Sequence, residues 1–178
     1  MRLRILVLAC VAVLAACASV SKNSRAPVTL VPRVDLPRFM GNWYVIASIP
    51  TRFENGAHNA MENYRLDPDG TIPTTFTFNA DAFDGPAKRY TSRGYVLDDK
   101  SGAIWGQQYV WPIKADYRIA YLSADYTETV IARAKRDYVW IMARTPSISS
   151  EDLARLTEFV ASQGYDPARL RKVPQKGG

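Results

Sequence analysis

The stretch FMGNWYVIASI, residues 39–49, decides the fold of this 178-residue chain. It is apolar and rich in aromatic and β-branched residues, which favour a β-strand. Alternation along the strand places the odd-numbered residues, from Trp43 to Ile49, on one face. We expect that face to be buried, with Gly41 leaving room for close approach of another part of the chain.

Seven further stretches are strand-like, and most are joined by short turn signals. They cover residues 59–66, 71–79, 89–97, 103–110, 117–122, 127–134 and 138–144. Eight strands joined in sequence by short connections are typical of an up-and-down barrel. The sequence therefore predicts an all-β fold, an eight-stranded antiparallel barrel.

The periodicity changes after the last of these strands. Serines and acidic residues at positions 147–152 favour the start of a helix, and Leu153, Leu156 and Val160 form one apolar stripe. Gly164 suits the end of this helix. We expect one C-terminal helix that packs against the outer wall of the barrel.

The first residues have the pattern of a signal peptide over positions 1–16. Two arginines precede an apolar run at 5–13 that is too short to span a bilayer. The small residues before Cys17 resemble a bacterial lipobox, which implies cleavage before Cys17 and diacylglycerol on its thiol. The alternative is an ordinary secretory signal followed by a cysteine that is there by chance.

A polar segment over residues 17–33 is expected to be a lipidated, flexible tether, leaving a domain over residues 34–178. Ala18 follows the cysteine where inner-membrane lipoproteins carry Asp, and this implies an anchor in the outer membrane. We expect the barrel to face the periplasm, with outer-membrane lipid as a partner through Cys17.

Composition argues against several other classes of protein. The net charge is +6, but the basic residues are scattered, so binding of nucleic acid is not indicated. If the signal peptide is removed, Cys17 is the only cysteine and no intramolecular disulfide can form. The lone histidine, His58, has no partner at metal-ligand spacing, so we expect no metal and no cofactor.

Three separated places resemble the signatures of the lipocalin family. Gly41-Asn42-Trp43 resembles the first, Asp125-Tyr126 the second, and Arg144 the third; Ala124 stands where the second usually has Thr. Residues 136–146 are similar to the same stretch of the bacterial lipocalins, outer-membrane relatives of apolipoprotein D. The resemblance implies that Trp43 seals one end of the barrel and that the Arg144 guanidinium lies across its indole.

The resemblance, combined with the alternation of the strands, implies an aromatic cavity with a few polar groups and a lid at residues 50–56. The expected ligand-binding residues are Glu62, Tyr64, Phe76, Phe78, Trp105, Gln107, Tyr109, Ile119, Tyr121, Trp140 and Met142. A carboxylate in such a cavity is costly. The alternative for Glu62 is a register slip of one residue that leaves it in solvent.

The function implied by the resemblance is binding, storage or transport of a hydrophobic ligand, a fatty acid such as palmitate or a lysophospholipid, in support of envelope maintenance. We expect no enzymatic activity. The alternatives are a carrier of haem or another aromatic molecule, an envelope enzyme with Glu62 or His58 as base, and a structural lipoprotein without a ligand. The oligomeric state, monomer or homodimer, stays open.

Overall fold

The computed structural model describes residues 26–177, so the predicted signal peptide and Cys17 lie outside the described residues. Its strands are β1 (Gly41–Ile49), β2 (Ala57–Tyr64), β3 (Ile72–Ala80), β4 (Ala87–Val96), β5 (Ile104–Val110), β6 (Ile113–Leu122), β7 (Glu128–Ala132), β8 (Val139–Ala143) and β9 (Arg171–Lys172). Its helices are α1 (Leu36–Phe39), α2 (Ser150–Ser162) and a 3-10 turn η1 (Pro167–Arg169). Within this range, no helix is both long and apolar enough to cross a membrane.

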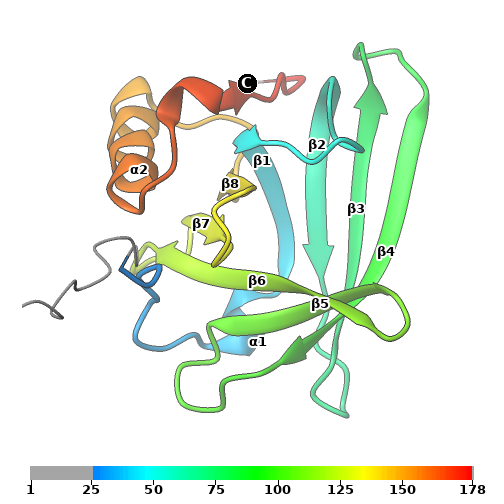
Figure 1. Ribbon diagram of the computed structural model, residues 1–178. Coiled ribbons are helices and arrows are strands. Elements are labelled where there is room, and N and C mark those ends of the chain that lie inside the picture. The colour runs from blue at the N-terminus through cyan, green and yellow to red at the C-terminus, as the bar shows by residue number, and fades with distance from the viewer. Residues whose placement is uncertain (1–25, 178) are drawn as a thin grey trace, which may run out of the picture.

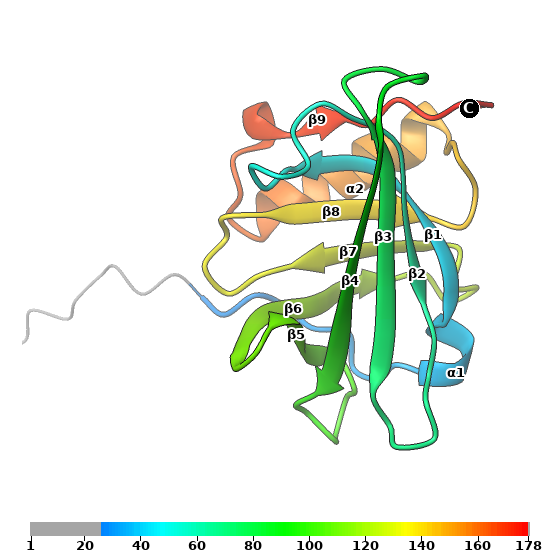
Figure 2. The same ribbon diagram turned by 90° about the vertical axis from the view of Figure 1, so that its right-hand side faces the viewer.

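The strands from β1 to β8 form a closed antiparallel barrel (Figure 1). Each strand pairs with the next in sequence, and β1 closes the ring by pairing with both β2 and β8. The short β9 adds to β1. The predicted eight-stranded up-and-down topology is confirmed. Figure 2 shows α1 at one end of the barrel, beside the start of β1.

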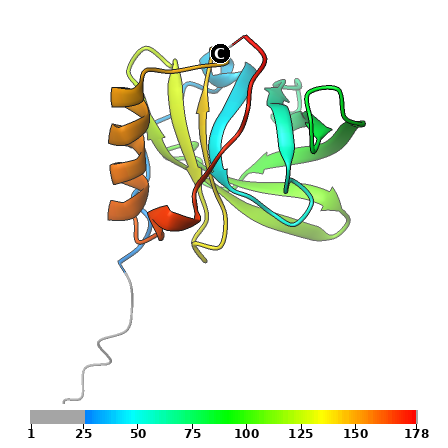
Figure 3. The ribbon, with the colours of Figure 1, turned by 90° about the horizontal axis from the view of Figure 1, so that it is seen from above.

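The C-terminal helix α2 lies outside the barrel, on the side away from β3 and β4 (Figure 1, Figure 3). Ser149 caps its start, because the side chain accepts a hydrogen bond from the Asp152 amide. Leu156 and Val160 are fully buried between the helix and the barrel wall. Gly164 follows the helix with a φ of +86°, a conformation that suits glycine. The predicted helix is confirmed.

A β-bulge in β1 changes which side chains face the interior. The register with β8 shifts between Val45 and Ala47, and beyond it Ser48 stands opposite the inward-facing Trp140. Ala47 and Ile49 consequently belong to the apolar layer under α2. The prediction that all odd-numbered residues from Trp43 to Ile49 face inward is therefore wrong beyond Val45, because a bulge inserts one residue into the alternation.

The turn between β5 and β6 is tighter than the sequence indicated. Trp111 and Pro112 form this turn, and β6 begins at Ile113, so four residues expected in a loop belong to the strand. Proline lacks an amide hydrogen, and at the tip of a hairpin no ladder hydrogen bond is lost. The tip is exposed, with Trp111 at 82% of its full accessibility.

Residues 26–33, the described part of the predicted tether, lie against the barrel. Val28 is buried in the layer between the barrel and α2. The Val31 amide donates to the Ile119 carbonyl at 3.2 Å, and the Thr29 amide donates to Gln163 Oε1 at 2.8 Å. Contrary to the expected flexible tether, this segment is held to the barrel by packing and hydrogen bonds.

Candidate binding cavity

The closed end of the barrel is built around the contact between Trp43 and Arg144. The Arg144 Cζ atom lies 3.9 Å from the centre of the Trp43 ring. The guanidinium also donates to the carbonyls of Asn42, at 2.8 Å, and of Arg38 and Phe39, at 3.0 Å each. The predicted stack is present, and it joins the end of β8 to α1 and to the start of β1.

Aromatic side chains fill the space above this contact. Phe39, Tyr64 and Trp105 pack against one another with ring centres 5.4–5.8 Å apart. Tyr117 stacks on Trp105, with ring centres 5.1 Å apart, and its hydroxyl lies 2.6 Å from the hydroxyl of Tyr64. We call these four residues, together with Trp43, the aromatic floor. It closes this end of the barrel to a ligand.

The turn at Asp125-Tyr126 supports the same end of the barrel. Asp125 Oδ1 accepts hydrogen bonds from the hydroxyls of Ser123, at 2.6 Å, and Thr127, at 2.8 Å. These two hydroxyls serve the turn although Ala124 stands at the position where the family usually has Thr. The Tyr126 hydroxyl accepts from the Asp35 amide at 2.9 Å, which ties the turn to α1.

A cavity of about 470 Å³ lies above the aromatic floor and opens at the end of the barrel that carries the segment between β1 and β2. Its lining comes from strands β2 to β6, from β8, and from the segments that follow β1 and β7. The lining residues are Thr51, Arg52, Phe53, Glu54, Glu62, Phe76, Tyr90, Gln107, Tyr109, Val110, Ala115, Asp116, Tyr117, Arg133, Tyr138 and Trp140. Nine of these sixteen residues are aromatic or aliphatic, and seven are polar or charged, a mixture that suits a ligand with both an apolar and a polar part.

Glu62 lies deep in this cavity. It stands opposite Trp43, a residue of the aromatic floor, on β1, and opposite Phe76 on β3. The residue is 9% exposed, and its Oε2 atom has no hydrogen-bond partner among the described residues. Burial, and secondarily the charge of Glu54, raise the Glu62 pKa to about 8. The carboxyl group is therefore mostly neutral at pH 7 when the cavity is empty.

The segment between β1 and β2, expected as a lid, is held to the neighbouring strand β8 by Glu54. Its Oε2 atom accepts from Trp140 Nε1 at 2.9 Å, and its Oε1 atom accepts from the Thr51 hydroxyl at 3.1 Å. Burial raises the Glu54 pKa, and these hydrogen bonds partly offset the rise. Unlike Glu62, Glu54 has protein partners for both oxygens.

Five of the residues predicted to bind ligand line the cavity. They are Glu62, Phe76, Gln107, Tyr109 and Trp140. Five others are buried in the barrel interior but outside the lining, where they pack against the floor and the walls: Tyr64, Phe78, Trp105, Ile119 and Met142. For these five residues, the alternation along the strands predicts the correct face of the sheet but does not show which residues lie beside the cavity.

Tyr121 requires a correction, because it does not face the interior. A register shift between Ile119 and Tyr121 in the pairing with β7 turns the ring outward. There it packs against Phe159 of α2, with ring centres 5.6 Å apart, and its hydroxyl accepts from Arg155 Nη1 at 2.9 Å. Tyr121 therefore joins α2 to the barrel wall and does not line the cavity.

Seven lining residues outside the lid are not among the predicted ligand-binding residues: Tyr90, Val110, Ala115, Asp116, Tyr117, Arg133 and Tyr138. The sequence predicts Ala115 and Asp116 in a loop, because Pro112 interrupts the strand pattern, so it does not place them on β6. Arg133 follows the end of β7, lies 3.4 Å from Asp137 between Nη1 and Oδ2, and has an unpartnered Nε atom among the described residues. An isolated arginine in sequence gives no signal of such a position.

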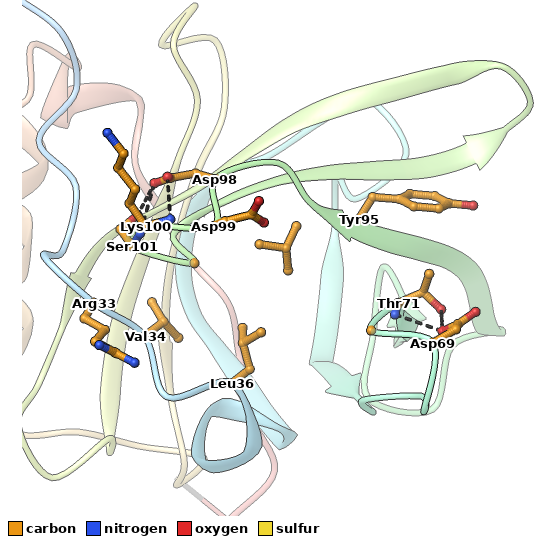
Figure 4. A pocket seen from close by; sticks show the side chains of 13 residues that line it. Arg33, Val34, Leu36, Asp69, Thr71, Tyr95, Asp98, Asp99, Lys100 and Ser101 are labelled. Atoms are coloured by element: carbon orange, nitrogen blue, oxygen red, sulfur yellow. Dashed lines mark hydrogen bonds between the residues drawn. The ribbon is translucent and has the colours of Figure 1, made fainter.

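A second cavity, of about 500 Å³, lies at the closed end, between the segment before α1 and the turns that follow β2 and β4 (Figure 4). Two of its three carboxylates, those of Asp69 and Asp98, have partners in their own turns. Asp69 accepts from Thr71, and Asp98 accepts from Ser101 and Lys100 (Figure 4). These hydrogen bonds lower the pKa values of both Asp69 and Asp98. The unsatisfied polar groups are in the barrel cavity, so we take that cavity as the candidate site.

His58 is not among the residues that line the barrel cavity. Its Nδ1 atom lies 3.0 Å from the Gly56 carbonyl oxygen, and its ring packs edge-on against Phe83. No group of three or more His, Cys, Asp or Glu side chains within residues 26–177 is arranged to hold a metal ion. His58 and Glu62 are therefore not brought together at one site.

Comparison with known proteins agrees with this architecture. Residues 34–175 match the family model described as a lipocalin-like domain. The chain is 33% identical to temperature-induced lipocalin-1 of Arabidopsis thaliana over 86% of each chain. It is 31% identical to outer membrane lipoprotein Blc of Citrobacter freundii, over 93% of this chain and 95% of that protein. The fold resembles insecticyanin of the tobacco hornworm Manduca sexta, with a TM-score of 0.68, 12% identity, and coverage of 86% and 87% of the two chains.

Proposed function

Because this chain belongs to the lipocalin family, we propose that it binds and carries single-chain lipids, fatty acids or lysophospholipids, in its barrel cavity. The observation that carries the proposal is the cavity itself: about 470 Å³, closed below by the aromatic floor and open at one end. An acyl chain gains about 0.8 kcal/mol for each methylene that it buries. The proposed activity is binding and transport, without catalysis.

The mouth of the cavity supports an amphiphilic ligand. Arg52 and Arg133 belong to the lining on the mouth side, where a carboxylate or phosphate head would find a cation. Phe53 and Val110 also belong to the lining and are more than half exposed, as is Trp111 nearby. Exposed apolar side chains of this kind are typical of surfaces that contact lipid or another protein. A chain buried below and a head group at the mouth would use both features.

We propose further that the protein is a lipoprotein of the outer membrane, with its barrel in the periplasm, and that it serves envelope maintenance. The name of the relative from Citrobacter freundii describes such a lipoprotein, and that relative covers nearly the whole chain. The lipobox-like residues before Cys17 provide the means of attachment.

Replacing Cys17 by serine should release the protein from the membrane. We expect Cys17→Ser to move it from the outer-membrane fraction to the soluble periplasmic fraction with its circular dichroism unchanged, because the anchor is separate from the barrel. Fractionation followed by immunoblotting measures this change. Retention of Cys17→Ser in the outer-membrane fraction would contradict the anchor and leave the binding proposal untouched.

The binding proposal is tested by titrating the purified protein with a homologous series of lysophospholipids and fatty acids. Trp140 lines the cavity, so ligand binding should change its fluorescence. Affinity should increase roughly fourfold per added methylene until the cavity is full, and then level off. Free monomeric ligand must stay below its micelle concentration throughout.

The chain length at which affinity stops increasing distinguishes a cavity from a non-specific apolar surface. A non-specific apolar surface would continue to gain affinity with chain length, whereas a cavity of fixed volume cannot. If no chain length changes the fluorescence while circular dichroism reports a β-fold, lipid carriage is wrong and a barrel without a ligand replaces it.

A further inference from the structure

One buried polar group of the cavity, the Glu62 carboxyl, has an oxygen without a partner among the described residues. Glu62 is nine-tenths buried, and one carboxyl oxygen makes no hydrogen bond within the described chain. Burying a polar group without a partner is costly, so such a group is either paired by a ligand or retained at a cost in stability. Its position beside the aromatic floor means that only the inner end of a bound molecule can reach it.

The charged groups that surround Glu62 favour a positive partner. Glu54, on the lid segment, and Asp116, on β6, are the other carboxylates of the lining. Asp116 is paired with Arg118 at 2.9 Å, whereas the charge of Glu54 contributes to the raised pKa of Glu62. The cations of the lining are Arg52, on the lid segment, and Arg133, which follows β7 and is paired with Asp137. The remaining titratable groups of the lining are Tyr90, Tyr109, Tyr117 and Tyr138.

We propose that, among amphiphiles that enter the cavity with their polar end first, the cavity selects those that carry an amine at that end, with Glu62 as the residue that binds this amine. The proposal rests on the proposed function, since it assumes that the barrel cavity holds the ligand. An alkylammonium group supplies N–H donors and a positive charge to an oxygen that lacks both. A hydroxyl supplies one donor and no charge, and an alkyl terminus or a carboxylate supplies neither.

Binding of an amine is coupled to release of a proton. The Glu62 carboxyl, with its pKa near 8, is mostly protonated in the empty cavity at neutral pH. Pairing with an alkylammonium ion requires the carboxylate, so the Glu62 proton leaves to solvent while the amine keeps its own. Affinity for the amine should therefore increase as the pH rises toward 8. The affinity of a neutral ligand should stay level or fall, because ionised Glu62 is then buried without a counter-ion.

Three probes of equal chain length separate these cases: dodecylamine, dodecanol and dodecanoic acid. We expect dodecylamine to bind at least about tenfold more tightly than dodecanol near pH 8, since a buried ion pair with hydrogen bonds replaces one neutral hydrogen bond. Its affinity should increase about 20-fold from about pH 6.5 to about pH 8.5, as the ionised fraction of Glu62 increases. Isothermal titration calorimetry in buffers of different ionisation enthalpy measures both the affinity and the released proton.

The variant Glu62→Gln keeps the shape of the side chain and removes its charge. It should abolish the preference for dodecylamine, the pH dependence and the proton release, and should leave dodecanol binding within about twofold. Glu158→Gln, at an exposed position of α2, is the matched control and should behave as the wild type.

Two results would overturn the selection of amines. One is equal affinity of dodecylamine and dodecanol in the wild type, and the other is a preference for dodecylamine that Glu62→Gln leaves intact. In both cases chain-length dependence with lysophospholipids would still support lipid carriage. Failure of all three probes and of the lysophospholipids would contradict the proposed function itself.

Discussion

Replacing Trp43 by alanine is expected to lower the free energy of unfolding by about 3–5 kcal/mol, as for other buried large aromatic residues. The side chain is fully buried, its Nε1 atom donates to the Phe39 carbonyl at 2.8 Å, and its ring carries the Arg144 guanidinium. Alanine would leave a cavity in the aromatic floor and remove the surface on which Arg144 lies. Urea unfolding followed by circular dichroism measures the loss.

Arg144→Ala should be less destabilising, because a cation–π contact contributes roughly 0.5–2 kcal/mol and the guanidinium is partly exposed. The stability losses of the two single variants should sum to more than the loss measured for the double variant, since each single change already removes the shared contact. Strictly additive losses would show that the contact between these two residues contributes nothing to stability.

Ala115→Trp is expected to weaken binding of long-chain lipids by roughly 200-fold, since the indole would occupy the space of about four methylenes. Ala115 stands opposite Gln107, and both residues line the cavity. The substitution removes no side-chain hydrogen bond, so the fold should persist. Fluorescence titration across the chain-length series should also show that affinity levels off at a shorter chain.

Ala154→Trp is the matched control for this substitution. Ala154 is exposed on α2, outside the barrel, and a tryptophan there should leave lipid affinity unchanged. If Ala115→Trp binds every chain as the wild type does, the lipid is held somewhere other than in the barrel cavity.

The closed end of the barrel was predictable from the sequence because its residue types leave few alternatives. A tryptophan two residues beyond the strand's glycine is too large for any place but a core, and a lone arginine at the end of the last strand needs carbonyl partners that the barrel end provides. The order of strands followed from the short connections between them. The outer helix followed from its single apolar stripe.

The side-chain directions beyond the bulges in β1 and β6 were not predictable, because bulges do not show in the pattern. One bulge in β1 reverses the alternation after Val45, and another in β6 turns Tyr121 from the interior to α2. Both faces of these two strands pack against apolar residues, so the residues before and after the bulge are equally apolar and the sequence does not show where the direction changes. Alternation resolves direction only where one face is polar.

Glu62 shows what the sequence gives for a single polar position. The alternation along its strand predicts that Glu62 faces the interior, and the structure places it there. The same pattern is equally consistent with a register slip of one residue that exposes Glu62 to solvent. Whether its oxygens have partners depends on residues far apart in sequence, Glu54 and Gln107 among them, and on the hydrogen bonds that those residues already make. That information exists only in three dimensions.

Native mass spectrometry of the protein extracted from the cell envelope, compared with the same protein after delipidation, tests lipid carriage most directly. We expect the envelope-extracted protein to carry an additional mass equal to one single-chain lipid, lost on delipidation and absent from Ala115→Trp. The same mass before and after delipidation, in protein that rebinds no lipid when it is supplied, would contradict lipid carriage in the barrel cavity.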